Sequence, residues 1–281
     1  AALYTGGPAG AGPPEGRLAS WPRLFADSEE PDVEALQQRV PQEVAEQIGK
    51  DVPRTQPRWL DAEGCRVLKR VLSAYAVMNP TVGYCQGMNN IAAVFVMMGF
   101  DEAAALRGLV SIMQKACPGY HGHGLEGYLR DVAVLEALVR SGRVLPPIIA
   151  ARLDALEVPL DVLASEHFLS LTARSWPLAA VERTWDLFLQ EGSPAVFASF
   201  LALLQMYLPA DGAEEQPLGG GIPGAVVDLE PVDVFRRAVR RGVSQDLDAI
   251  LQRVRELIPK VPHALIEKHR DAQCGSGAGV R

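Results

Sequence analysis

Apolar residues recur every three or four positions along much of the chain, with polar residues between them. This spacing places the apolar side chains on one face of a helix, so each such stripe predicts an amphipathic helix. The three clearest stripes are Val67, Leu68, Val71, Leu72 and Tyr75; Leu129, Val132, Leu135, Leu138 and Val139; and Leu247, Ile250, Leu251, Val254, Leu257 and Ile258.

Four further segments are apolar on almost every side and are therefore expected to be central helices. They cover residues 91–98, 106–113, 168–171 and 196–208. The alternating pattern typical of strands is almost absent. The sequence thus predicts an all-α, multi-helix fold with no significant β-sheet.

Proline and glycine mark the expected ends of these helices. The breaks fall at Asn79-Pro80, Cys117-Pro118-Gly119, Pro146-Pro147, Ser193-Pro194 and Pro209. We expect a flexible segment over residues 1–16, one helical domain over 17–270, and a flexible tail over 271–281. A loop at 210–231 contains three consecutive glycines and five acidic residues, and we interpret it as a surface insertion.

Composition narrows the function classes. The chain is 48% hydrophobic, which suffices for a large core, and carries a net charge of −7 without a long basic tract, which argues against nucleic acid as a partner. Four scattered cysteines without a CxxC pair fit reduced thiols in the cytoplasm. The longest apolar run, residues 91–100, is half a membrane span, so no direct membrane insertion is expected.

Nucleotide and metal sites are not expected in this chain. The glycine-rich 210–231 loop lacks the Gly-Lys-Ser/Thr ending of a phosphate-binding loop, and no other segment supplies one. Cys117, His121 and His123 come near the spacing of metal ligands, but a fourth ligand is missing.

A first polar island covers residues 48–55. Pro53 fixes its own φ, and the residue before a proline is biased toward extended geometry, so Val52 is expected to be extended. Arg54 would then project a planar fork of five donors from a stiff loop, which suits a phosphate. The alternative is a plain surface ion pair with Asp51, three residues earlier.

A second island, residues 83–89, places Gln86 between Gly83 and Gly87. Glycines permit unusual backbone angles or the close approach of a partner, and Asn89 or Asn90 is expected to cap the helix that follows. The alternative is that the Gln86 amide bonds only to the local backbone. Cys85 as a nucleophile would need a nearby histidine or positive charge, and the sequence alone does not tell whether any of the five histidines lies beside it.

A third island completes a pattern. Ser175-Trp176-Pro177 is followed after five residues by Arg183-Thr184-Trp185-Asp186. With Ile48-x-x-Asp51-x-x-Arg54-Thr55 and Tyr84-x-Gln86-Gly87, the chain resembles the TBC domain of Rab GTPase-activating proteins over roughly residues 17–265. Arg17-x-x-x-Trp21 also resembles the opening helix of that family.

The resemblance implies an all-helical domain that supplies two catalytic fingers in trans. Arg54 would be the arginine finger, and Gln86 would orient the attacking water. Asp51 would position Arg54, while Thr55, Tyr84 and Gly87 would shape the two loops. Supporting residues behind the site would be Arg183, Trp185 and Asp186.

The resemblance also implies the partners. The chain would act on a GTP-bound Rab GTPase in vesicle trafficking and would carry no cofactor of its own, because GTP and Mg²⁺ would be on the Rab. It would be a cytoplasmic GTPase activator and not an enzyme, with no nucleotide site of its own, and would be peripheral to endomembranes through the Rab. The alternative is a catalytically inactive TBC-type module that only binds a GTPase or acts as a scaffold.

Overall fold

The computed structural model describes residues 15–25, 30–208 and 230–276, which form helices joined by turns and contain no strand. The all-α prediction is confirmed. Residues of the expected flexible ends and most of the 210–231 loop lie outside the described part. Helix α1 already begins at Glu15, and α14 continues to Ser276, six residues past the expected domain boundary at 270.

The chain divides into two units, residues 1–130 with 166–196 and residues 131–165 with 197–281. The first unit contains α1 (Glu15–Ser20), η1 (Trp21–Leu24), α2 (Val33–Gln37), α3 (Gln42–Asp51), η2 (Val52–Arg54), α4 (Ala62–Met78), α5 (Met88–Met97), α6 (Glu102–Lys115), η3 (His123–Leu125) and α10 (Leu178–Glu191). The second contains α8 (Pro147–Leu156), α12 (Pro231–Gln245), α13 (Leu247–Leu257), η4 (Ile258–Lys260) and α14 (His263–Ser276). The unit boundaries fall within α7 (Glu126–Arg140), α9 (Leu160–Ser170) and α11 (Ser193–Tyr207).

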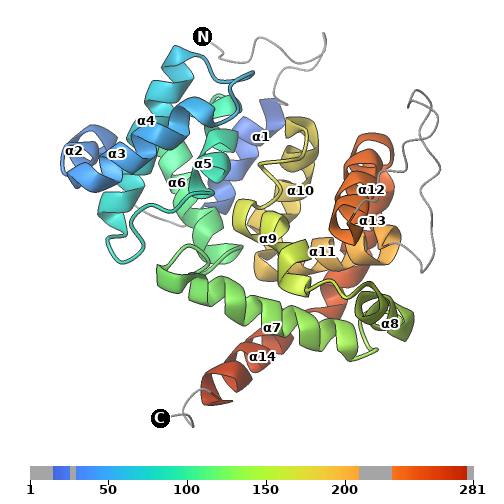
Figure 1. Cartoon of the computed structure of the whole chain (residues 1–281). Coiled ribbons are helices and arrows are strands. Elements are labelled where there is room, and N and C mark those ends of the chain that lie inside the picture. The colour runs from blue at the N-terminus through green and yellow to red at the C-terminus, as the bar shows by residue number, and fades with distance from the viewer. Residues whose placement is uncertain (1–14, 26–29, 209–229, 277–281) are drawn as a thin grey trace. The chain divides into compact units, whose positions relative to one another are not determined.

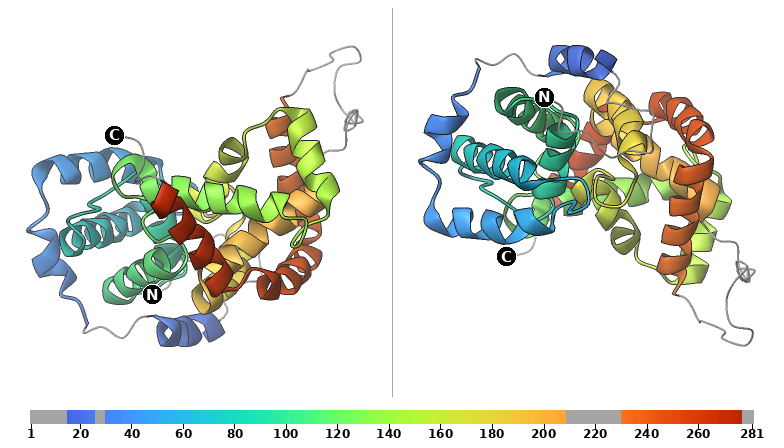
Figure 2. Two further views of the ribbon diagram at one scale, coloured as in Figure 1. Left: turned by 90° about the horizontal axis from the view of Figure 1, so that it is seen from below. Right: turned by 90° about the horizontal axis from the view of Figure 1, so that it is seen from above.

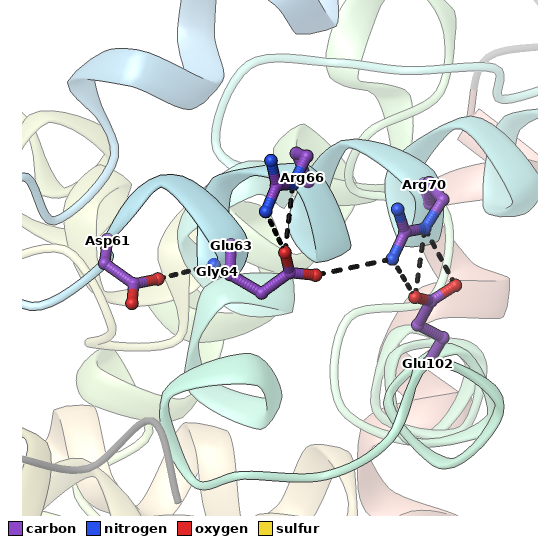
Figure 3. A network of polar contacts seen from close by, with 6 residues as sticks. All are labelled: Asp61, Glu63, Gly64, Arg66, Arg70 and Glu102. Carbon is purple, nitrogen blue, oxygen red and sulfur yellow. Dashed lines mark hydrogen bonds and ion pairs between the residues drawn. The ribbon is translucent and has the colours of Figure 1, made fainter. Parts of the chain in front are cut away.

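In the first unit, α4 packs against α2, α3, α5 and α6 (Figures 1 and 2). Its N-terminus is capped by Asp61, whose carboxylate accepts from the Gly64 amide at 2.7 Å. Arg70 of α4 forms an ion pair with Glu102 at the start of α6, and Arg66 pairs with Glu63 on α4 itself (Figure 3). Since α4 begins after the arginine island and ends before the glutamine island, it sets the positions of both.

The core of the first unit contains a cluster of aromatic rings at the junction of η1, α5, α6 and α10. Trp21 stacks on Trp185 with ring centroids 6.2 Å apart, and Phe95 contacts both rings. Phe25 and Phe100 complete the cluster. As predicted, α5 is central, with each side chain from Ile91 to Met98 buried.

In the second unit, α12 packs against α13, and Phe235 of α12 meets Phe200 of α11 edge to face. The stripe predicted for 247–258 is confirmed, with Ile250, Leu251 and Val254 almost fully buried.

The stripe predicted over α7 is partly wrong. Leu129 is 54% exposed, whereas Tyr128 and Val134 are buried. The polar Asp131 is fully buried on the same helix and pairs with Arg270 of α14, its Oδ1 accepting from the arginine Nε at 2.8 Å. Because that partner comes from 139 residues away, the hydrophobic pattern could not reveal the buried carboxylate.

Within the described ranges, no helix is both long enough and apolar enough to cross a bilayer.

Candidate functional site

The arginine island follows helix α3 without a break. Val52 has φ −54° and ψ −46°, and its amide donates to the Ile48 carbonyl. The expectation of an extended Val52 is therefore wrong. Its side chain is 4% exposed, so burial and a continuing helical turn outweigh the bias imposed by Pro53. Arg54 ends a 3-10 turn and does not project from an extended loop.

Arg54 extends into solvent, with its side chain 75% exposed, yet its stem is fixed. Its Nε donates to the Lys50 carbonyl at 3.0 Å, and one Nη2 hydrogen donates to Asp51 Oδ1 at 3.3 Å. The surface ion pair considered as an alternative is thus present. The bonds to Lys50 and Asp51 together use two of the five guanidinium donors, which leaves the other three available to an anion.

The glutamine island begins at the end of α4 and ends at α5. Gly87 is the residue before α5 and has φ +113°, a conformation that favours glycine. A Cβ atom there would lie 3.1 Å from the Leu169 carbonyl oxygen. The expected side-chain cap from Asn89 or Asn90 is wrong, because Gly87 is the N-cap residue and α5 begins at Met88.

Gln86 is exposed, and its side-chain amide makes no hydrogen bond to any residue that the structure describes. Its backbone carbonyl accepts a hydrogen bond from the Cys85 thiol. The alternative in which its amide bonds to the local backbone therefore does not hold here. A primary amide with both donor and acceptor free is able to bind and orient a water molecule.

Buried hydrogen bonds join the two islands. Asp51 accepts from the Tyr84 hydroxyl at 2.8 Å, and the Thr55 hydroxyl accepts from the Asn89 side-chain amide at 2.8 Å. The Thr55 hydroxyl in turn donates to the Asp51 carbonyl at 2.9 Å. Asn89 Oδ1 closes the network by accepting from the Gly87 amide at 2.9 Å.

The network is well shielded from water. Asp51, Thr55, Tyr84 and Asn89 are each at most 9% exposed. Burial, reinforced by the hydrogen bond to Asp51, raises the pKa of Tyr84 far above its usual range, so this hydroxyl remains a donor. Asn89 was expected only as a helix cap, and its role as a bridge depends on a contact 34 residues distant.

The third island follows a segment of the chain that lies close to the other two islands. Ser175 and Trp176 follow residues 169–173, which comprise the end of α9 and the start of the turn after it. The Gln56 amide donates to the Ala173 carbonyl of this segment, and the Leu169 carbonyl lies close to Gly87. Trp185 is fully buried and donates from its indole nitrogen to the Leu171 carbonyl in that turn at 2.8 Å. Arg183 is half-buried on α10.

Asp186 connects the third island to the start of the chain. Its carboxylate accepts from Arg17 Nε at 2.9 Å and from Trp21 Nε1 at 2.8 Å. Arg17 also pairs with Glu182, whose pKa is raised by burial against the opposing effect of Arg17. The sequence pattern Arg17-x-x-x-Trp21 is therefore explained by one shared carboxylate.

The alternative chemistries find little support. Burial, with a further contribution from the Asp51 charge, raises the pKa of the Cys85 thiol and so disfavours the thiolate that a nucleophile needs. His121 is buried, which lowers its pKa, and its Nε2 donates to the Leu169 carbonyl at 2.9 Å. No group of three or more His, Cys, Asp or Glu side chains able to hold a metal is found among residues 15–25, 30–208 and 230–276.

Comparison with known proteins identifies the family. The family model described as the Rab-GTPase-TBC domain matches residues 17–210, which is more than half of the chain. The chain belongs to this family. All three polar islands and Arg17 lie inside the matched region.

Individual relatives in the TBC family are moderately similar. "Growth hormone-regulated TBC protein 6" of Caenorhabditis elegans is 37% identical over 169 residues, covering 59% of this chain and 50% of the relative. "TBC1 domain family member 10B" of Homo sapiens is 34% identical over 142 residues, covering 50% of this chain and 17% of the relative. The chain thus spans half or less of the length of these relatives.

Solved structures share the fold. The crystal structure of the Chlamydomonas flagellar RabGAP TBC domain superposes with a TM-score of 0.59 at 20% identity, covering 86% of this chain and 75% of that one. The Ypt/Rab-GAP domain of Gyp1p superposes with a TM-score of 0.55 at 18% identity, covering 87% and 82%. At this identity the likeness concerns the fold alone.

Proposed function

We propose that this TBC domain accelerates GTP hydrolysis by a GTP-bound Rab GTPase, with Arg54 and Gln86 supplied in trans. The Rab would bring GTP and Mg²⁺, and the chain would add no cofactor. Membership in the Rab-GTPase-TBC family supports Rab GTPase activation in general. The Rab would also bring the chain to endomembranes.

The observation that carries this proposal is the buried network joining the two islands. It fixes the backbones on both sides of Arg54 and Gln86, through the Asp51–Tyr84 and Thr55–Asn89 hydrogen bonds, while leaving both side chains exposed. Catalysis of phosphoryl transfer needs positioned charge and a positioned water more than covalent chemistry. A fixed mount with an exposed guanidinium and an exposed amide meets both needs.

Each residue then has a defined task. Arg54 would place its remaining donors on the phosphoryl oxygens, where negative charge spreads in the transition state, and Gln86 would orient the attacking water. Asp51 would hold Arg54 through Oδ1 and Tyr84 through Oδ2, so that one carboxylate couples both loops.

Single-turnover phosphate release with a panel of GTP-loaded Rabs tests the proposal. We expect the wild-type chain to accelerate at least one Rab. Arg54→Ala and Arg54→Lys should lose most of that acceleration, since an arginine finger is worth about 10³–10⁵ in rate and an ammonium lacks the planar fork. Gln86→Ala should also accelerate hydrolysis far less than the wild type does. Arg39 and Gln38 are both exposed, so Arg39→Ala and Gln38→Ala are matched controls. Both variants should accelerate hydrolysis as the wild type does.

Two results would contradict the proposal. Full activity of both Arg54→Ala and Gln86→Ala on a responsive Rab would exclude the two-finger mechanism. Binding to a Rab loaded with GDP and aluminium fluoride, without acceleration of any Rab, would instead support the inactive binding module.

A further inference from the structure

Residues 169–173, the end of α9 and the start of the turn that follows, form a segment that we name the support turn, and its backbone is unusual. Leu171 and Thr172 are consecutive non-glycine residues with φ of +47° and +68°. Such angles carry a steric cost for residues with a side chain, so they persist only where surrounding contacts enforce them. Both residues are almost fully buried, and Trp185 holds the Leu171 carbonyl.

The support turn contacts the glutamine island through the Leu169 carbonyl. That oxygen lies 3.1 Å from the position of a Cβ on Gly87 and accepts a hydrogen bond from His121. Any side chain at Gly87 would therefore push against the turn, in addition to being strained by its positive φ.

Through the Ala173 carbonyl, the same turn contacts Gln56, the residue directly after the arginine island. Gln56, two residues after Arg54, donates from Nε2 to this oxygen at 3.0 Å, across 117 residues of sequence. Gln56 is itself in the left-handed region, with φ +47°. Its backbone carbonyl accepts from the amides of Trp59 and Leu60 at 2.8 and 3.1 Å, so a tight turn starts at this residue.

We propose that Gln56 is a positioning residue that fixes the arginine island to the support turn and thereby aligns Arg54 with the glutamine island. The proposal rests on the function proposed above. Thr55 is held by the buried network on one side of Gln56, and the turn to Leu60 follows on the other. The Gln56 amide is the cross-link that ties this strained junction to the turn that also supports Gly87.

A role in alignment has a specific kinetic signature. Gln56 would act through Arg54 and not through Rab binding, so its loss should lower the maximal rate and leave the Rab concentration for half-maximal rate unchanged. Small misplacements of a catalytic group cost large factors in rate, up to about 100-fold for 1 Å. We therefore expect a loss of about 10-fold when the side chain can no longer donate.

Donor chemistry separates this role from mere packing. Gln56→Leu keeps the approximate size but removes the donor, and Gln56→Glu turns a carboxylate toward the carbonyl. Both should lose about 10-fold in maximal rate. Gln56→Lys keeps an N–H donor and should restore most of the rate. Gln38→Leu, at an exposed position on the polypeptide before α3, is the matched control and should match wild type.

The experiment combines single-turnover hydrolysis over a range of Rab concentrations with hydrogen exchange of the free chain. In the free chain, Gln56→Leu should speed amide exchange in residues 54–60, whereas Gln56→Lys should not. Three results would overturn the proposal. They are a wild-type maximal rate for Gln56→Leu, a maximal rate for Gln56→Lys as low as that of Gln56→Leu, or a change only in the Rab concentration that gives half-maximal rate. If the wild type activates no Rab, the proposed function fails, and unchanged exchange in Gln56→Leu would still overturn the cross-link separately.

Discussion

At the scale of single residues, the two proposed fingers are held in different ways. Arg54 is anchored by its stem to Lys50 and Asp51, whereas the Gln86 side chain has no hydrogen-bond partner in the described part of the chain and depends on its backbone for placement. Gly87, with φ +113° against the Leu169 carbonyl, fixes that backbone. The long Arg54 side chain is thus held by direct hydrogen bonds, whereas the shorter Gln86 side chain is placed by its rigid backbone.

Trp59 is the exposed aromatic residue nearest in sequence to Arg54, and we predict that it contacts the Rab. Its side chain is 52% exposed, while its amide is fixed to the Gln56 carbonyl. Rigid exposed tryptophans often carry much of the energy of an interface. Trp59→Ala should weaken binding to Rab loaded with GDP and aluminium fluoride by about 10-fold, corresponding to about 1.4 kcal/mol.

The control for this prediction is Leu129→Ala, which removes an apolar side chain of similar exposure, 54%. Calorimetric titration of both variants with the same Rab measures the effect. Equal affinities for Trp59→Ala and wild type would contradict the predicted contact.

At the scale of elements, the site depends on how closely α5 and α6 approach each other. Gly108 of α6 faces the Phe95 ring of α5, and a Cβ at this glycine would lie 2.5 Å from that ring and 2.9 Å from Phe25. Since α5 begins at Met88, directly after Gln86 and Gly87, its seating on α6 sets the place of the glutamine island.

Gly108→Ala should therefore destabilise the chain by about 1–3 kcal/mol, because the added methyl group overpacks a filled aromatic core. Gly49 in α3 is the matched control, since a Cβ there meets nothing within 4 Å. Gly49→Ala should stabilise by about 0.5–1 kcal/mol through helix propensity. Thermal melting of both variants tests this pair, and a stable Gly108→Ala would show that α5 and α6 can separate without cost.

At the scale of the whole molecule, the described helices extend well past the matched family region. That match ends at residue 210, whereas α12, α13 and α14 cover most of 231–276. Within the second unit, α14 is joined to α7 by the buried pair of Arg270 and Asp131, whose side chains are 7% and 0% exposed. The stability of the second unit therefore depends in part on Arg270, which lies outside the region matched by the family model.

Arg270→Met should destabilise the chain by about 3–5 kcal/mol, because it leaves the Asp131 carboxylate buried without its cation. Adding Asp131→Leu to this variant should recover much of the loss, since the pair is then replaced by apolar side chains. Arg140→Met, at the exposed pair with Asp154, is the control and should leave the melting temperature unchanged. A melting temperature for Arg270→Met equal to that of wild type would contradict the importance of the pair.

The sequence predicted the helical class and several helix ends because these depend on local properties. Periodic apolar residues define α4 and α13, and Pro146-Pro147 and Ser193-Pro194 mark the starts of α8 and α11. The prediction failed where a distant contact outweighed a local preference. Val52 became helical because it is buried, and Asp131 entered the core because α14 supplies Arg270.

In the candidate site, too, local sequence patterns account for some features and distant contacts account for others. Three spaced motifs in the sequence by itself determined the family and singled out Arg54 and Gln86, since recognition needs only residue type and order. Tertiary structure decided that Asp51 binds Tyr84, that Asn89 bridges to Thr55, and that Gln56 reaches Ala173. These contacts join residues 33 to 117 positions apart, and hydrogen bonds over such separations exist only after the helices have packed.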